Sequence, residues 1–209
     1  MTDSIQLYGF GHSDRSGKIR WLANELGIEV EEKKVELGDH RKPEYKAINP
    51  FASIPTAVYN GETMIESTAC CIHLAELHPE SKLAVFAKEP ARYEYLKWIS
   101  ICSESFEGRL VDHILANYGL MPEELKAIHE KTLTFKCKVL VEQLPQTGFL
   151  VAERFTVADI IACYSLKLAI LTGFIEWSQV KEYMSPLMAR EAAIKSHFFD
   201  GLNDFLSKQ

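Results

Sequence analysis

The pattern of apolar residues changes near residues 79–90, and this change constrains the fold more than any other feature of the 209-residue chain. Before it, short β-type runs alternate with helical ones, whereas beyond it only helical periodicity remains. We therefore expect two domains, a mixed α/β domain over residues 1–80 and an all-helical domain over residues 89–209.

The first 80 residues predict the element order β-α-β-(α)-β-β-α. Apolar residues on one helical face precede Gly27, which suits the end of a helix. Asn60-Gly61 separates two β-type runs and is a strong hairpin signal, because both residues tolerate positive φ. The expected strands are residues 5–10, 28–37, 55–59 and 62–65, and the expected helices are residues 13–26 and 67–77, with a short segment before Asn49.

The remainder of the chain predicts helices alone. Apolar residues recur at spacings of three and four from Leu96 to Ile114, which indicates one long helix. Pro122 suits the first turn of a second helix. Further helices are expected over residues 122–144 and 157–171, and one or two more between residues 178 and 206.

Composition excludes several classes of partner. The net charge of −6 disfavours nucleic acid, which binds concentrated positive charge. The most apolar stretch, residues 157–174, contains Asp159 and Lys167 and makes a poor membrane span. The amino terminus has no secretory pattern, and five cysteines without a CxxC motif favour a reducing, cytoplasmic location. No histidine motif predicts a metal site.

The segment from Asn49 to Ser67 carries the clearest chemistry. Ile54-Pro55 lies at the entry of a hairpin strand, and a cis bond there would leave the Ile54 backbone free to pair with a peptide. Ser67 begins a helix, whose N–H groups suit a carboxylate, and Glu66 suits an ammonium group. Together they fit a small zwitterionic peptide. A hairpin followed by a capped helix, with no ligand, explains the same residues equally well.

These residues resemble those of the cytosolic glutathione transferases. The family pattern NP-x-G-x-[IV]-P, followed by G and ES-x-A-I, stands here as NPFASIP, NGETMIESTAC. The second family hallmark is a capping box, here Thr156 to Asp159, with Phe155 and Ile160 at the staple positions. Two residues depart from the pattern, Ala52 in place of glycine and Cys70 in place of isoleucine. The resemblance implies a thioredoxin-like amino-terminal domain followed by an all-α carboxy-terminal domain.

The resemblance also implies a function. A serine-type member would bind glutathione as cosubstrate, without a metal, and transfer it to a small hydrophobic electrophile, acting as a homodimer. Ser13 falls where the serine-type classes carry the residue that activates the thiol. A hydroxyl at the start of a helix can donate a hydrogen bond to the thiolate, and the helix dipole favours that anion. Three alternatives remain. Ser13 could simply cap the helix, the activating residue could be Tyr8, and Ser16 is a weaker candidate for the same role.

Further contacts follow from the same resemblance, each with packing or solvation as its alternative. The predicted glutathione contacts are His40, Arg41, Ser53, Ile54, Pro55, Glu66 and Ser67. The predicted electrophile pocket comprises Phe10, His12, Phe106, Arg109 and His113, with Ser103 and Tyr118 as further candidates.

Two rival functions use the same fold. The first is another glutathione-dependent reaction, such as disulfide or peroxide reduction, dehalogenation or isomerisation. The second is a non-catalytic glutathione-binding module with a regulatory role.

Overall fold

The computed structural model describes residues 3–12, 14–120 and 122–208 and separates into two compact units. The first unit comprises Met1–Ala84 together with Met188–Gln209, and the second comprises Val85–Leu187. The chain thus returns to its first unit at the end, which the change of pattern near residues 79–90 did not indicate.

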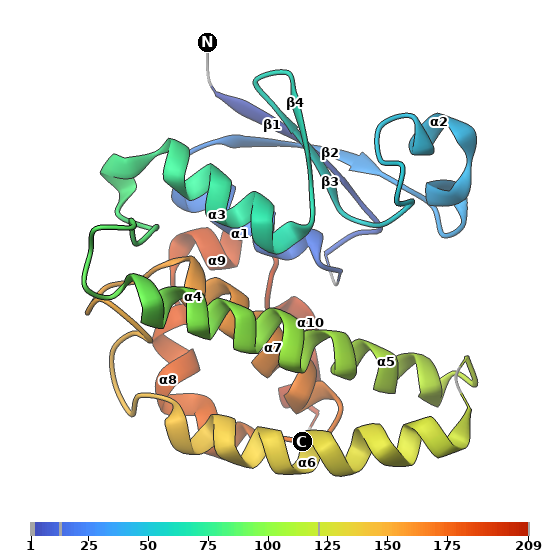
Figure 1. The fold of residues 1–209 in the computed structure, drawn as a ribbon, viewed down its shortest axis with the longest axis vertical. Helices are drawn as coiled ribbons and strands as arrows, with labels where there is room; N and C mark the ends of the chain where they lie inside the picture. Colours follow the sequence, from blue (N-terminus) through green and yellow to red (C-terminus); the bar gives the residue numbers. More distant parts are fainter. Residues whose placement is uncertain (1–2, 13, 121, 209) are drawn as a thin grey trace. The chain divides into compact units, whose positions relative to one another are not determined.

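The first unit is built on a mixed sheet, which Figure 1 shows with its helices. The strand order is β2-β1-β3-β4, with β1 parallel to β2 and β3 antiparallel to both β1 and β4. The predicted order of elements is therefore confirmed. Its elements are β1 (Ser4–Gly9), α1 (Ser16–Glu25), β2 (Glu29–Lys34), a 3-10 turn (Asp39–Arg41), α2 (Pro43–Lys46), β3 (Thr56–Tyr59), β4 (Glu62–Ile65) and α3 (Ser67–Leu77).

The two faces of this sheet have different surroundings. Ile5 and Leu7 of β1 are fully buried, and α1 and α3 pack against each other and against the strands. Tyr8 alternates with them and therefore lies on the opposite face. The β3–β4 turn has φ values of 50° at Asn60 and 80° at Gly61, as the hairpin signal predicted.

The carboxy-terminal segment of the first unit packs on α1. It contains α9 (Glu191–Lys195) and α10 (Asp200–Leu206). Arg190 makes two hydrogen bonds to Glu25, at 2.6 and 2.7 Å, and the Trp21 ring contacts Phe198 with a centroid distance of 4.9 Å. These contacts bury Trp21 completely.

The second unit is helical throughout its regular structure. Its elements are α4 (Arg92–Ser100), a π-helical stretch η3 (Ile101–Glu107), α5 (Gly108–Asn117), α6 (Glu123–Gln143), α7 (Val157–Leu171) and α8 (Trp177–Met188). The expectation of one or two helices after residue 178 was wrong, since α8, α9 and α10 all lie there. The helical backbone is interrupted between α9 and α10, where His197 has a φ of 56°.

The long helix expected around Leu96 to Ile114 is a helical path with a π-helical centre. The π-helical stretch Ile101–Glu107 separates α4 from α5, and Leu96 of α4, which the spacing placed on the buried face, is 37% exposed. Regular spacing alone revealed neither feature.

The capping box of α7 is confirmed. Thr156 accepts a hydrogen bond from the Ala158 N–H, and Asp159 accepts one from the Thr156 N–H at 2.9 Å. Phe155 and Ile160, at the staple positions, are both buried. Within the described residues, no helix combines the length and apolar character needed to cross a membrane.

Candidate functional site

Three strands of the first unit, β1, β3 and β4, have neighbouring termini at one end of the sheet. The register pairs Tyr8 with Thr56 and Thr56 with Ile65. The end of β1, the start of β3 and the end of β4 therefore lie side by side. The first turn of α3 follows β4 after one residue, whereas a loop joins the end of β1 at Gly9 to the start of α1 at Ser16. This end of the sheet brings together most of the residues predicted to contact glutathione.

Asp14 organises the loop between β1 and α1. Its Oδ2 atom accepts hydrogen bonds from the backbone N–H groups of Phe10 (2.5 Å) and Gly11 (3.2 Å), and its Oδ1 atom accepts one from Ser16 (2.6 Å). A carboxylate is favoured at this position by the unpaired N–H groups and dipole of the helix start. Ser13, the predicted thiol-activating residue, lies outside the described residues, but its neighbours form this loop.

Ser16 closes the same loop from the other side. Its side chain is completely buried, and its hydroxyl donates to the Gly11 carbonyl at 3.2 Å. Gly9 is in close contact, because a Cβ atom there would lie 2.8 Å from the Ser16 Oγ. Ser16 therefore holds the loop, which is consistent with its lower rank as a thiol-activating candidate.

Asn49 holds the segment that precedes β3. Its side-chain amide donates to the Ser53 carbonyl at 2.9 Å and to the Thr56 hydroxyl at 3.0 Å, and the Tyr45 hydroxyl donates to the same carbonyl. Asn49 is fully buried. The sequence pattern did not assign Asn49 a role of its own, although a buried asparagine must find hydrogen-bond partners nearby.

Ile54 carries an unused backbone edge. The Ile54-Pro55 peptide bond is cis, as the sequence suggested. In the described part of the chain, no residue hydrogen-bonds the Ile54 N–H or carbonyl, whereas the Ser53 carbonyl is occupied. This main chain can pair with an extended peptide. Two residues earlier, Ala52 has a φ of 51°, which explains why the family pattern has glycine there.

Glu66 and Ser67 lie at the start of α3. Glu66 has φ 64° and ψ 96°, a conformation that costs a non-glycine residue roughly 1–3 kcal/mol. Its side chain is exposed, whereas Ser67 is 5% exposed at the first helical position. Strained residues of this kind cluster at ligand and active sites.

His40 and Arg41 lie in the 3-10 turn after β2. The His40 ring contacts the Phe10 ring edge-on, with a centroid distance of 5.3 Å, so the turn reaches the loop after β1. The buried His40 Nδ1 has no hydrogen-bond partner among the described residues. Arg41 is exposed.

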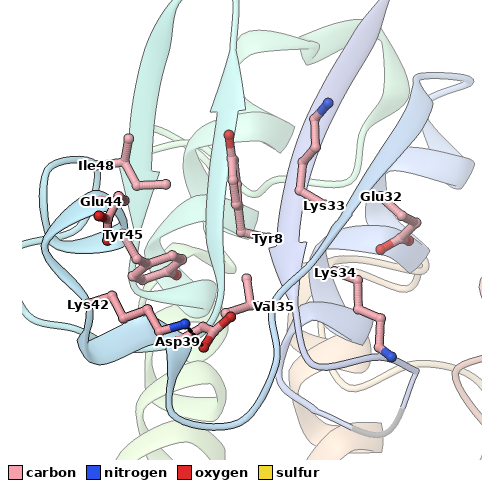
Figure 2. A pocket seen from close by; sticks show the side chains of 10 residues that line it. All are labelled: Tyr8, Glu32, Lys33, Lys34, Val35, Asp39, Lys42, Glu44, Tyr45 and Ile48. Carbon is pink, nitrogen blue, oxygen red and sulfur yellow. Dashed lines mark ion pairs between the residues drawn. The ribbon is translucent and has the colours of Figure 1, made fainter.

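Tyr8 faces a different cavity, shown in Figure 2. This open cavity of about 830 Å³ lies on the sheet face away from α1, and the Tyr8 ring contacts the Tyr45 ring there at 6.2 Å. Lys33, the cross-strand neighbour of Tyr8, also lines the cavity. Lys42 and Asp39 line it as well and form an ion pair. The geometry separates the Tyr8 side chain from the first turn of α1.

The predicted electrophile residues have varied surroundings. In the first unit, Phe10 contacts His40, and the exposed His12 contacts the His197 ring at 4.8 Å. No sequence pattern pointed to His197, because the return of the carboxy-terminal segment to α1 is a long-range contact.

In the second unit, the three predicted pocket residues do not share one environment. Phe106 lines a small apolar cavity of about 180 Å³, and the Arg109 guanidinium donates to the Ser105 carbonyl. His113 is buried against Phe174, and its burial lowers its pKa.

The protein's own thiols are unsuited to nucleophilic chemistry. All five cysteines are buried, and none of them forms a disulfide. Burial raises the pKa of Cys70, Cys102 and Cys137 to about 12 in each case, and it raises the pKa of Cys163 further. These four side chains are therefore poor sources of a thiolate near neutral pH. Among the described residues, no group of three or more His, Cys, Asp or Glu side chains could hold a metal ion.

Comparison with known proteins agrees with this geometry. Residues 7–82 match the family described as "Glutathione S-transferase, N-terminal domain". Glutathione S-transferase 3 of Zea mays is 27% identical over 163 residues, covering 74% of this chain and 73% of the relative. Glutathione S-transferase D7 of Drosophila melanogaster is 33% identical over 91 residues, covering 43% of this chain and 41% of the relative.

Solved structures share the whole fold. A glutathione transferase from Methylococcus capsulatus superposes with a TM-score of 0.80 at 23% identity, covering 95% of this chain and 99% of that one. Ure2p in complex with glutathione superposes with a TM-score of 0.82 at 18% identity, covering 94% and 99%. The thioredoxin-like sheet followed by a helical unit is thus the glutathione transferase fold. The comparisons thus show that residues 7–82 match the glutathione S-transferase amino-terminal domain and that the chain has the glutathione transferase fold.

Proposed function

We propose that the protein binds glutathione and transfers it to a small hydrophobic electrophile. The observation that carries this proposal is the free main chain of Ile54 beside the strained start of α3. The cysteinyl backbone of the tripeptide would pair with Ile54, and a carboxylate would bind the N–H groups at Ser67. Glu66 would take the ammonium group, and His40 and Arg41 would lie toward the glycyl end.

In the proposed reaction, Ser13 donates a hydrogen bond to the glutathione sulfur and favours the thiolate, while the thiol proton passes to solvent. The sulfur electron pair then forms a bond to an electrophilic carbon, and the leaving group departs with the bonding electrons. A free thiol has a pKa of about 8.5, so a decrease of one or two units makes thiolate the main form near neutral pH. Holding both reactants together makes the attack effectively intramolecular.

The test separates binding from activation. Calorimetry should show saturable glutathione binding, and absorbance of the bound thiolate should titrate at a lower pH than that of free glutathione. Ser13→Ala should reduce turnover of a halogenated nitroaromatic by about tenfold or more, a barrier change of about 1.4 kcal/mol, with a smaller effect on binding. Tyr8→Phe is the matched control, because its hydroxyl lies on the other sheet face. Absence of binding at millimolar glutathione would refute the proposal, and a collapse of turnover in Tyr8→Phe would reassign the activating residue.

Reactions named for other relatives define the main rival. A probable maleylacetoacetate isomerase of Caenorhabditis elegans is 32% identical over 96 residues, and the β-etherase LigF has the same fold at 20% identity. Turnover of a glutathione mixed disulfide, with none of a halogenated aromatic, would favour reduction over transfer. Glutathione binding without a lowered thiol pKa would favour a regulatory module.

We also propose that the protein is a cytoplasmic homodimer, as the family resemblance implies. Five cysteines that form no disulfide suit a reducing compartment. Phe135 and Val139, at the edge of the small apolar cavity in the second unit, are 69% and 40% exposed, which supports coverage by another chain. Sedimentation should give twice the chain mass, and Phe135→Ser should shift the protein toward monomer. A monomeric wild-type protein would refute the dimer.

A further inference from the structure

Arg20 is a buried cation next to the loop that precedes α1. The residue is 3% exposed, although it lies on the second turn of a helix at the sheet surface. Burying an arginine is costly unless its donors are paired, so its partners need an explanation.

Those partners connect a strand to the loop. The guanidinium forms a fork with Glu32 of β2, with Nε at 2.5 Å and Nη2 at 3.0 Å. The same Nη2 atom lies 3.1 Å from the Ser16 Oγ and 3.4 Å from the Gly11 carbonyl. Since the Ser16 hydroxyl itself donates to Gly11, Arg20 and Ser16 hold this carbonyl together.

The peptide groups of Gly11 are therefore fixed from both sides. Asp14 accepts the Gly11 N–H, while Ser16 and Arg20 bind its carbonyl. Gly11 has a φ of 150° and no Cβ to restrict it, so these contacts rather than steric limits determine its position. Ser13 follows two residues later in the sequence.

The fork to Glu32 does not satisfy the whole guanidinium. Its Nη1 atom is buried and has no hydrogen-bond partner in the described part of the chain. An unsatisfied buried donor is unfavourable, and an apolar side chain would fill the same space without it. The arrangement is therefore better explained by the loop contact than by the stability of α1.

We infer that Arg20 is a positioning residue, which holds the Gly11 carbonyl and thereby fixes the start of the loop between β1 and α1, to which the proposed thiol-activating Ser13 belongs in the sequence. This inference rests on the proposed function. Because Arg20 acts through the loop, its loss should raise the pKa of the bound thiol while leaving the affinity for glutathione nearly unchanged.

The experiment compares Arg20→Met with Arg190→Met in the full-length protein. Arg190 makes a similar two-bond pair with Glu25, but at the opposite end of α1 from the loop. Amide exchange of residues 10–14, measured without ligand, should become at least about tenfold faster in Arg20→Met only. The thiolate fraction of bound glutathione below neutral pH should fall about three- to tenfold, with the dissociation constant changed less than about threefold.

Each outcome decides a separate point. Unchanged exchange and thiol pKa in Arg20→Met would overturn the inference, and so would equal effects in Arg190→Met, which would indicate general loosening. If the wild-type protein binds no glutathione, the proposed function fails, but the exchange measurement still tests the anchoring of the loop. If Arg20→Met does not fold, Arg20→Lys retains the charge and stem but loses the fork, and it should show the same changes more weakly.

Discussion

Asp159 is the side chain whose removal we expect to be most damaging to the second unit. It is fully buried at the start of α7 and accepts four hydrogen bonds. One oxygen binds the Thr156 N–H (2.9 Å) and the Thr156 hydroxyl (3.2 Å), and the other binds the Leu150 N–H (3.0 Å) and the Tyr183 hydroxyl (2.9 Å). Burial raises the pKa of this carboxyl, and the hydrogen bonds oppose that effect.

The expected magnitude follows from the groups that lose their acceptor. Asp159→Ala leaves two backbone N–H groups and the buried hydroxyls of Thr156 and Tyr183 without their acceptor, each costing about 1–3 kcal/mol. Partial relaxation of the neighbouring groups should limit the total loss of unfolding free energy to about 3–5 kcal/mol. Asp159→Asn should cost less, about 1–3 kcal/mol, because its oxygen can still bind Thr156 while its amide faces Leu150. Tyr183→Phe removes one bond and should cost about 1–2 kcal/mol.

Urea unfolding followed by tryptophan fluorescence and circular dichroism measures these changes. The predicted order of unfolding free energies is wild type, Tyr183→Phe, Asp159→Asn, then Asp159→Ala. In the Asp159→Ala background, Tyr183→Phe should have a much smaller effect, since its partner is already absent. A loss below about 1 kcal/mol in Asp159→Ala would show that the capping network contributes little and would refute this reasoning.

Three further predictions concern stability. Ala52→Gly should raise the unfolding free energy by about 0.5–1 kcal/mol, because it relieves a left-handed conformation, and a lower urea midpoint would contradict this. Arg190→Ala should cost about 2 kcal/mol by leaving the nearly buried Glu25 carboxylate without its cation, measured against Glu25→Gln as a milder variant. His113 has a folded-state pKa below its usual 6.5, so the stability that it contributes is present above about pH 6.5 and is lost as the pH falls further. Urea midpoints from pH 7.5 to 5.5 should fall more for wild type than for His113→Phe, and parallel curves would contradict the assignment.

Both units were predictable where local signals determine structure. The Asn60-Gly61 turn, Gly27 after α1 and the Thr156 capping box all act through neighbouring backbone groups, and each lies where the sequence predicted it. The cis bond before Pro55 was anticipated for the same reason. Local chemistry of this kind can be recognised without knowledge of the tertiary structure.

Long-range contacts explain what the sequence did not reveal. Arg20, Glu32 and Gly11 meet only after β2 pairs with β1, and no spacing in the sequence announces that contact. The return of the carboxy-terminal segment brings His197 to His12 in the same way. The π turns of η3 could not be predicted either, because apolar spacings of three and four fit an ordinary helix as well.

The two halves of the proposed reaction differ in how the protein specifies them. Glutathione would be recognised largely by backbone geometry, namely the free edge of Ile54 and the constrained start of α3 at Glu66. Such geometry depends on the fold, whatever reaction follows. An electrophile would instead meet side chains, and His113 shows how little a residue type reveals, because its ring is already engaged with Phe174 and Asn117. Since burial raises the pKa of Cys70, Cys102, Cys137 and Cys163, the proposed reaction would depend on the thiol of bound glutathione. The fold therefore constrains the proposed nucleophile much more tightly than the molecule that it would attack.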